Sequence, residues 1–346
     1  MSNRILIIGA FGDLTHSLSG QTIKTRNVYE LIKHRSECDV YKADTSSIKR
    51  RPHLALSMLY RLIQVKTVVL IPCLNNLTYL FPFVYYLSKV FRYEIIQICI
   101  GGWQVEYFGG NERFKAHPLQ LKLSKKIKAF LPEMIKVDND LKGLYGFKNS
   151  EVFPNFRHFE AFESKNDGET LKLVFMARIN KKKGYETIFN LAQLIIENHY
   201  NISISFYGQI EEPDRSHFLA EVEKYKDVAT YKGVLQPTDI YKTLSQYDIM
   251  LFPTTYYTEG FPGTILDAYI SGIPVIATNW KHAREFIKDG ETGYVVPFED
   301  GQEEFNNRVL ELFNDRRLLA ELKNKAKKES ERYSEESAWK VISKYL

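Results

Sequence analysis

The stretch "LKLVFMARINKKKGYETIFNLAQLIIENH", residues 171–199, joins a continuous apolar run, a basic turn and an amphipathic run. A short, uninterrupted apolar run is typical of a strand buried on both faces, and the apolar spacing after the turn indicates a helix. A further apolar run, "ISISFYGQ" at 202–209, predicts a second strand. Strand, helix and strand in this order predict a βαβ unit and hence a parallel sheet.

The same alternation continues on both sides of this stretch. Because 346 residues exceed what one hydrophobic core usually fills, we expect an α/β protein with two doubly wound domains, joined near the polar segment 163–170. The expected further strands are 4–10, 67–72, 94–102, 229–234, 248–254 and 273–279, and the expected further helices are 21–34, 237–247 and 264–271.

Composition indicates a globular protein, with 44% apolar and 26% charged residues. The three cysteines match no metal or disulfide spacing, and the start "MSNRILIIGAF" lacks the features of a signal peptide. We therefore expect a cytoplasmic protein. No apolar run is long enough to cross a bilayer.

The net charge of +5 is unevenly distributed. Residues 1–155 carry 22 Lys/Arg and 12 Asp/Glu, whereas residues 156–346 carry 25 and 30. Such a basic half attracts anionic partners, and an anionic membrane surface or a phosphorylated acceptor fits it better than nucleic acid, whose recognition motifs are missing. A basic face that serves only solubility is the open alternative.

The loop after the first expected strand, "GAFGDLTHSLSGQTIKTRN" at 9–27, does not complete a dinucleotide-binding glycine fingerprint. We also find no acidic residue at the end of a second strand where that fingerprint requires one. Gly20, within Ser19-Gly20-Gln21, opens a helix whose free backbone N–H groups suit an anion. An ordinary helix start explains the same residues equally well.

Two cations follow the strand of the opening stretch. Arg178 ends that strand and Lys183 precedes Gly184 and a helix, so both can reach one diphosphate. We expect two of Lys181, Lys182 and Lys183 to be merely solvated.

The stretch "EGFPGTILD", residues 259–267, places two acids around a glycine-rich turn. Thr264 and Asp267 fit a capping box, in which Thr264 caps the helix, and this is a complete structural explanation of Asp267. Glu259 has no such explanation, and a ligand hydroxyl is a plausible partner for it. The N–H groups near the helix start form a natural anion site at Gly260, Phe261, Gly263 and Thr264.

Together these segments resemble the family 4 glycosyltransferases, which are retaining enzymes of the GT-B fold. The resemblance covers residues 150–300 densely: "EVFPNFRHFE", "LVFMARINKKKGYETIFNLAQLI", "TYKGVLQPTDIYKTLSQYDIMLFPT" and "EGFPGTILDAYISGIPVIATNWKHAREFIKDGETGYVVP", the last with the family's E-x7-E pattern. Over residues 1–150 it rests mainly on "SGQTIKTRNVYELI". The end "ESERYSEESAWKVISKYL" is similar to the family's terminal helix, which returns to the N-terminal domain.

The resemblance implies two Rossmann-like domains facing each other across a cleft. They would be an acceptor domain (1–160) and a donor domain (161–328), with a returning helix (329–346). The donor would be a nucleotide sugar, UDP- or GDP-linked, without a metal or other cofactor. Arg178 and Lys183 would neutralise its diphosphate, Glu259 would contact the transferred sugar and Asp267 the ribose. Further donor contacts would come from Gly20, Gly208, Val234, Gly260, Phe261, Gly263 and Thr264.

Two features depart from the family pattern. The second acid is Asp267 rather than Glu, and no histidine follows the middle strands of the first half, where many relatives have one. His16 stands in the first loop, where a solvated or core role is more usual. The D-x-D spelled by Asp138 and Asp140 resembles a metal motif of the GT-A fold, but a surface turn explains it.

The acceptor is predicted to be a glycan or a polyprenyl-diphosphate-linked glycan of surface polysaccharide assembly. "HPLQLKLSKKIKAFLP", residues 117–132, is basic and amphipathic and suits the inner face of an anionic cell membrane. The aromatic run at 79–86 either lines a groove for a lipid or glycan or packs in the core. Alternative functions are a nucleotide-sugar epimerase or hydrolase, a nicotinamide dehydrogenase, and a non-catalytic nucleotide-sugar-binding scaffold.

Overall fold

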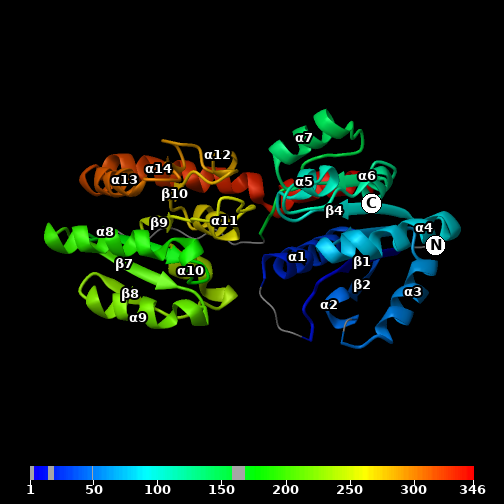
Figure 1. The fold of residues 1–346 in the computed structure, drawn as a ribbon, viewed down its shortest axis with the longest axis horizontal. Helices are drawn as coiled ribbons and strands as arrows, with labels where there is room; N and C mark the ends of the chain where they lie inside the picture. The colour runs from blue at the N-terminus through cyan, green and yellow to red at the C-terminus, as the bar shows by residue number, and fades with distance from the viewer. Residues whose placement is uncertain (1–3, 15–18, 49, 158–167) are drawn as a thin grey trace. The chain divides into compact units, whose positions relative to one another are not determined.

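We describe a computed structural model of the chain, which covers residues 4–14, 19–48, 50–157 and 168–346. The chain divides into two compact units (Figure 1). Unit 1 consists of Met1–His158 together with Tyr333–Leu346, and unit 2 consists of Phe159–Arg332. Each unit is built around its own sheet and is described separately.

Unit 1 contains a five-stranded sheet in the order β2-β1-β3-β4-β5, in which all neighbouring strands run parallel. Within this sheet, β1 pairs with β2 on one side and with β3 on the other, so that Ile7 lies opposite Lys42 and Val69. The strands are β1 (Arg4–Gly9), β2 (Asp39–Asp44), β3 (Thr67–Ile71), β4 (Glu94–Ile98) and β5 (Ala129–Leu131).

The helices of unit 1 cover both faces of this sheet. The core joins alternate strand residues such as Ile5, Ile7 and Ile96 to α1 and to Ala338 and Ile342 of α15, the last α-helix of the chain. The helices are α1 (Gly20–Arg35), α2 (Thr45–Ile48), α3 (Leu54–Gln64), the π-helix η1 (Asn76–Leu80), α4 (Phe81–Phe91), α5 (Gln104–Gly109), α6 (Pro118–Ser124), α7 (Ile135–Tyr145), α15 (Glu335–Ile342) and η6 (Ser343–Tyr345).

Unit 2 contains a six-stranded parallel sheet in the order β11-β10-β9-β6-β7-β8. Its strands are β6 (Leu171–Met176), β7 (Ile202–Tyr207), β8 (Ala229–Tyr231), β9 (Ile249–Phe252), β10 (Val275–Thr278) and β11 (Gly293–Val296). Its main helices are α8 (Tyr185–Glu197), α9 (Arg215–Lys224), α10 (Ile240–Leu244), α11 (Gly263–Ile270), α12 (Ala283–Phe286), α13 (Gln302–Asn314) and α14 (Arg316–Glu329). Unit 2 also contains four short helices: η2 (Lys181–Lys183), η3 (Glu212–Asp214), η4 (Pro237–Asp239) and η5 (Ser330–Tyr333).

Two doubly wound α/β units with parallel sheets were predicted, and this prediction is confirmed. The sequence patterns did not predict β2, β5 and β11, each of which is an edge strand of three to six residues. Such strands lack the long apolar run that marks a central parallel strand. Most of the predicted linker, residues 163–167, lies outside the described residues.

Candidate functional site

The predicted donor-binding residues of unit 2 lie at one edge of its sheet. Arg178 and Lys183 follow β6, Gly208 follows β7, Val234 follows β8, and the segment from Glu259 to Asp267 follows β9. These four strands are consecutive neighbours and run parallel, so their carboxyl ends meet at the same edge. This is the edge at which sheets of this class bind their ligands.

The loop between β6 and α8 holds Lys183 in a defined position. The Asn180 side chain caps the short helix η2 by accepting a hydrogen bond from the Lys183 N–H at 3.1 Å. Gly184 then turns the chain with φ +77°, where a Cβ atom would lie 1.7 Å from the Pro253 carbonyl oxygen. Lys181 and Lys182 are exposed whereas Lys183 is half-buried, as the sequence predicted for two of the three.

The loop after β9 is tied to the loop after β6. The Thr254 hydroxyl and the Thr255 N–H both donate to the carbonyl oxygen of Lys182, at 3.1 and 3.0 Å. The ammonium of Lys183 forms an ion pair with the carboxylate of Glu259, and each side chain is only 16% exposed. The two residues that the sequence predicted to serve one ligand are therefore in direct contact.

The opposite charges of Lys183 and Glu259 compensate each other within the protein. The Lys183 ammonium also lies 5.6 Å from the centre of the Phe252 ring, which further shelters it from water. An ammonium has three N–H donors, so the bond to Glu259 leaves donors that phosphate oxygens can accept from. Binding an anion here shares Lys183 between the ligand and Glu259.

The predicted capping box of α11 is wrong. The helix begins at Gly263 with Pro262 as its N-cap residue, and no side chain caps it. The Thr264 hydroxyl instead donates to the Met176 carbonyl oxygen at 2.7 Å, which fastens α11 to the end of β6. Thr264 is already inside the helix, so its hydroxyl cannot serve the first turn as a cap does. Asp267, in the same helix, is 6% exposed.

The start of α11 provides backbone groups rather than side chains. The Phe261 ring stacks on the Phe286 ring, with centres 4.2 Å apart and an angle of 2° between the planes. This contact leaves the backbone of Phe261 as its candidate ligand group. The first N–H groups of a helix have no partner within it and carry partial positive charge, so the segment from Gly260 to Thr264 suits an anion.

The remaining predicted residues differ in exposure. Arg178 is 71% exposed and forms an ion pair with Glu211 at 3.2 Å, and Val234 is exposed. Gly208 has φ +140°, and a Cβ atom there would lie 1.8 Å from the Ala177 carbonyl oxygen, so the backbone must be bare at this point. In unit 1, Gly20 is the first residue of α1, Ser19 caps that helix, and the space around Gly20 is open.

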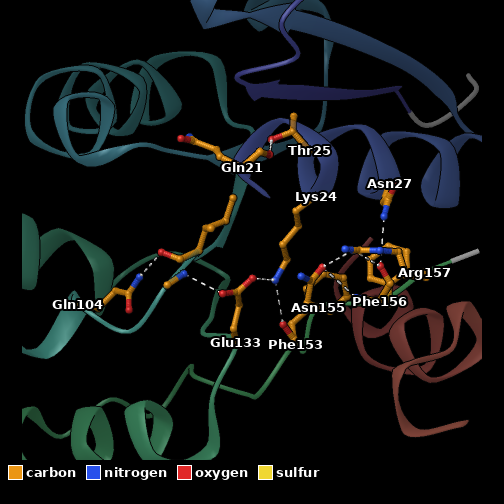
Figure 2. Close-up of polar contacts among 12 residues, drawn as sticks. Gln21, Lys24, Thr25, Asn27, Gln104, Glu133, Phe153, Asn155, Phe156 and Arg157 are labelled. Atoms are coloured by element: carbon orange, nitrogen blue, oxygen red, sulfur yellow. Dashed lines mark hydrogen bonds and ion pairs between the residues drawn. The ribbon is translucent and has the colours of Figure 1, made fainter. Parts of the chain in front are cut away.

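Unit 1 has a buried charge network that the sequence did not predict (Figure 2). The Lys24 ammonium lies 2.6 Å from a carboxylate oxygen of Glu133, and the two side chains are 1% and 3% exposed. Lys24 also donates to the Phe153 carbonyl oxygen at 3.3 Å, and Glu133 accepts from the Gly101 N–H at 2.7 Å. Burial lowers the pKa of Lys24, against the raising effect of Glu133. The partners stand 109 positions apart, so no local pattern could have predicted this pair.

An acidic residue does end the second strand, contrary to the sequence prediction. The Asp44 carboxylate, at the end of β2, accepts hydrogen bonds from the N–H groups of Phe11 at 2.9 Å and Asp13 at 3.0 Å. Burial would raise its pKa, but these bonds and those from Ser46 and Ser47 outweigh burial and lower the pKa to about 2. Asp44 thus holds the loop after β1 in place, and both of its carboxylate oxygens are used in hydrogen bonds to that loop.

A cavity of about 350 Å³ lies beside this loop in unit 1. Its lining includes Lys42, Arg51 and Arg61 together with Tyr41 and Met58. Lys42 is paired with Asp13 at 2.9 Å, and the Arg61 guanidinium lies 4.0 Å from the centre of the Tyr41 ring. The lining is therefore mixed, because the carboxylates of Asp13 and Asp44 lie in it beside these cations and apolar side chains.

Other sequence interpretations need correction. The D-x-D does not lie in a surface turn but in helix α7, where Asp138 pairs with Lys142 at 2.7 Å and Asp140 with Lys136 at 3.4 Å. The expected membrane-binding stretch 117–132 is not one amphipathic element. It forms α6 and β5, and its apolar residues Leu123, Ile127, Phe130 and Leu131 are buried in the core.

The aromatic run at 79–86 divides between core and surface: Phe81 and Tyr85 are buried, and Tyr79, Phe83 and Tyr86 are exposed. His16 lies outside the described residues. Within the described ranges, no group of three or more His, Cys, Asp or Glu residues is placed to hold a metal ion. No helix in that part of the chain is long and apolar enough to cross a membrane.

Comparison with known proteins identifies a family and relatives with similar sequences. Residues 156–329 match the model of the family described as Glycosyl transferases group 1. The capsular polysaccharide biosynthesis glycosyltransferase CapM of Staphylococcus aureus is 26% identical over 208 residues, which are 57% of this chain and 53% of that protein. The chain thus spans about half the length of this curated relative.

Solved structures resemble the whole chain. The sucrose-phosphate synthase of Thermosynechococcus elongatus matches with a TM-score of 0.73 and 15% identity, over 99% of this chain and 98% of that one. HepE of Anabaena, solved in complex with UDP and glucose, matches with a TM-score of 0.69 and 14% identity over the same shares. At this identity the likeness shows the fold alone, and the predicted GT-B fold class is confirmed.

Proposed function

The chain belongs to the glycosyl transferases group 1 family, and from this premise we propose that it transfers a sugar from a nucleotide-sugar donor to a glycan or lipid-linked glycan. We further propose that transfer retains the anomeric configuration and serves surface polysaccharide biosynthesis. The ion pair between Lys183 and Glu259, at the carboxyl edge of the sheet in unit 2, is the observation that carries the proposal. The name of CapM supports the pathway class, and the UDP held by HepE supports a UDP-linked or GDP-linked donor.

The proposed roles follow from the negative charge that develops on the leaving group during sugar transfer. The leaving group is a nucleoside diphosphate, so the main catalytic need is fixed cations and N–H dipoles aimed at its oxygens. Lys183, Arg178 and the N–H groups from Gly260 to Thr264 would meet that need. Glu259 would contact the transferred sugar and Asp267 the ribose, while Gly208 and Val234 would border the nucleotide. A donor phosphate oxygen would take the acceptor proton, so no protein nucleophile is required.

We propose that the acceptor is a polyprenyl-diphosphate-linked glycan held at an anionic membrane surface on the cytoplasmic side. The cavity in unit 1 supports an anionic acceptor, because Arg51 and Arg61 line it. The two carboxylates in the same lining already have partners: Asp13 pairs with Lys42, and Asp44 accepts from backbone N–H groups. No metal or other cofactor is proposed, since fixed cations replace a metal at the diphosphate.

The Lys183–Glu259 contact gives this proposal a discriminating test. In Glu259→Gln the positive charge of Lys183 is no longer compensated, so the free nucleoside diphosphate should bind at least as tightly as to the wild type. Sugar transfer should nevertheless fall by about 100-fold, because the contact with the sugar is lost. Lys183→Met should weaken diphosphate binding and transfer together. Lys182→Met is the matched control, since Lys182 is exposed in the same short helix.

The assay follows nucleoside diphosphate release and glycan products from a panel of nucleotide sugars, with and without lipid-linked acceptors. Acceptor-dependent transfer that both site variants lose would support the proposal. Release or interconversion of the donor sugar without an acceptor would instead identify a hydrolase or epimerase. Donor binding without turnover by the wild type would identify a non-catalytic scaffold.

A further inference from the structure

Residues 45–93 of unit 1 are unusually cationic. They contain seven Lys/Arg residues and no Asp or Glu, and the acids that bound the segment are Asp44 and Glu94. The rest of the chain holds 40 Lys/Arg and 42 Asp/Glu, so this segment accounts for more than the whole net charge of +5. One of the seven, Lys49, is outside the described residues. The other six are Arg50, Arg51, Arg61, Lys66, Lys89 and Arg92.

The same segment exposes apolar side chains in two helical rows. On α3, Leu56, Tyr60 and Ile63 are 57–70% exposed. On the continuous helix formed by η1 and α4, the row is Tyr79, Phe83, Tyr86 and Val90, which are 46–77% exposed. Each row repeats at three- and four-residue steps, so its members lie along one side of the helix. We call these seven residues, with the basic residues that flank them, the α3–α4 face.

These rows are not the faces that pack against the sheet. Met58 and Leu62 of α3, and Phe81, Val84 and Tyr85 at the start and middle of α4, are buried on the opposite sides. Each helix is therefore apolar on two sides, one inside the unit and one in water. A surface helix normally presents polar residues to water, and large exposed apolar patches mark binding sites.

Both rows lie on the same face of the sheet. The chain moves from β1 to β2 in one direction along the sheet, and then from β2 to β3 and from β3 to β4 in the opposite direction. Because such parallel crossovers are right-handed, α3 and α4 cover one face and α1 covers the other. Figure 1 labels α3 and α4 in unit 1, and α15 packs on α1.

Basic side chains flank both rows. Arg50 and Arg51 precede α3 and Lys66 follows it, while Lys89 is in the last turn of α4 and Arg92 caps that helix. All five are exposed. None of them forms an ion pair with another described residue, and the Lys89 ammonium lies 4.7 Å from the centre of the Tyr85 ring, so no carboxylate neutralises these five charges within the described residues.

We propose that the α3–α4 face docks on an anionic lipid bilayer. Aromatic and aliphatic side chains enter the boundary between headgroups and acyl chains, and Lys and Arg around them contact anionic headgroups. A second copy of this chain fits poorly, because two such faces would bring like charges together. The face lies on α3 and α4 instead of the stretch 117–132, in which Leu123, Ile127, Phe130 and Leu131 are in the core and the exposed large apolar side chain is Leu119.

The docking rests on the proposed function only in that a lipid-linked acceptor gives the enzyme a reason to be at a membrane. Binding of vesicles requires neither donor nor acceptor, so the two proposals fail separately. Vesicle binding without any response to nucleotide sugars would refute the proposed function and leave the docking intact. A thermal or catalytic response to a nucleotide sugar without vesicle binding would refute the docking and leave the proposed function intact.

The experiment is cosedimentation of the full chain with vesicles of phosphatidylglycerol and phosphatidylcholine, compared with phosphatidylcholine alone. The wild type should bind the anionic vesicles and be released by high salt. The variant Lys89→Gln/Arg92→Gln should lower the partition coefficient by about 30-fold, at about fivefold per basic residue. Tyr79→Ser/Phe83→Ser/Tyr86→Ser should lower it by at least about tenfold.

The matched control is Ile135→Ser/Leu144→Ser, which removes two apolar residues that are also exposed in unit 1 but lie on α7. It should bind vesicles as the wild type does, and all variants should keep the wild-type melting temperature. The proposal is overturned if the wild type does not bind anionic vesicles or if the control loses as much binding as the α4 variants. It is also overturned if the aromatic variant only converts a dimer to a monomer, since the face would then be an interface between copies.

Discussion

Replacing Lys24 by Met tests how much the buried pair of Lys24 and Glu133 contributes to the stability of unit 1. The side chains of Lys24 and Glu133 are 1% and 3% exposed, and their charged atoms lie 2.6 Å apart. In Lys24→Met the Glu133 carboxylate stays buried and keeps the hydrogen bond from the Gly101 N–H. Leaving one charge of a buried pair uncompensated costs about 3–5 kcal/mol. In a unit of this size that corresponds to a fall in melting temperature of roughly 6–20 °C.

The assay is differential scanning calorimetry of the full chain, following the transition that includes unit 1. Lys128→Met is the control, because Lys128 pairs with Glu94 at 2.5 Å in the same unit but the side chains are 28% and 56% exposed. A surface pair contributes less than about 1 kcal/mol, so this variant should melt within about 4 °C of the wild type. The double variant Lys24→Met/Glu133→Gln should recover at least half of the loss. Equal shifts for Lys24→Met and Lys128→Met would refute the reasoning.

Three further predictions concern particular contacts. Gly184→Ala should destabilise unit 2 by about 2 kcal/mol or more, because the added Cβ atom meets the backbone of Pro253. Gly290→Ala, with φ +74° but open space around it, should cost about 1 kcal/mol. Equal melting temperatures of the two variants would count against the backbone contact with Pro253. Thr264→Val should cost about 1 kcal/mol in the same melt, through the lost bond to Met176, and Thr264→Ser should restore it. Because the pKa of Asp44 is lowered to about 2 from 3.8, its charge stabilises unit 1 above pH 4, and this stabilisation should be lost as the pH falls from 4 to 2. Asp44→Asn should remove this pH dependence, and a wild type and variant that respond to acid identically would show that the carboxylate does not carry it.

The regular parts of the fold were predictable because each central strand is a continuous apolar run next to a helical pattern. The stretch 171–199 gave β6, the turn at Lys183 and α8 nearly to their ends. The edge strand β2, "DVYKAD", was not predicted because three of its six residues are charged and it pairs on one side only. The aromatic run at 79–86 did not reveal the α4 row of the α3–α4 face, since apolar residues on two sides of a helix blur the period that separates inside from outside.

The candidate site was predictable only as a set of residue types after strands. The sequence placed Lys183 and Glu259 in separate loops, and the parallel order of β6 and β9 brings them into contact. Thr264 was misassigned because a T-x-x-D pattern fits a cap, while the structure uses the hydroxyl to hold α11 on β6. Lys24 and Glu133 offered no local signal, since only the assembled sheet brings them together.

The central claim, that Lys183 and Glu259 mark a nucleotide-sugar site, is tested most directly by thermal shift with a panel of UDP- and GDP-sugars. At a hundred times its dissociation constant, the correct donor should stabilise the wild type and Lys182→Met by about 2.7 kcal/mol. Lys183→Met should lose most of that stabilisation relative to its own ligand-free form. No shift with any nucleotide sugar, or an undiminished shift in Lys183→Met, would contradict the account.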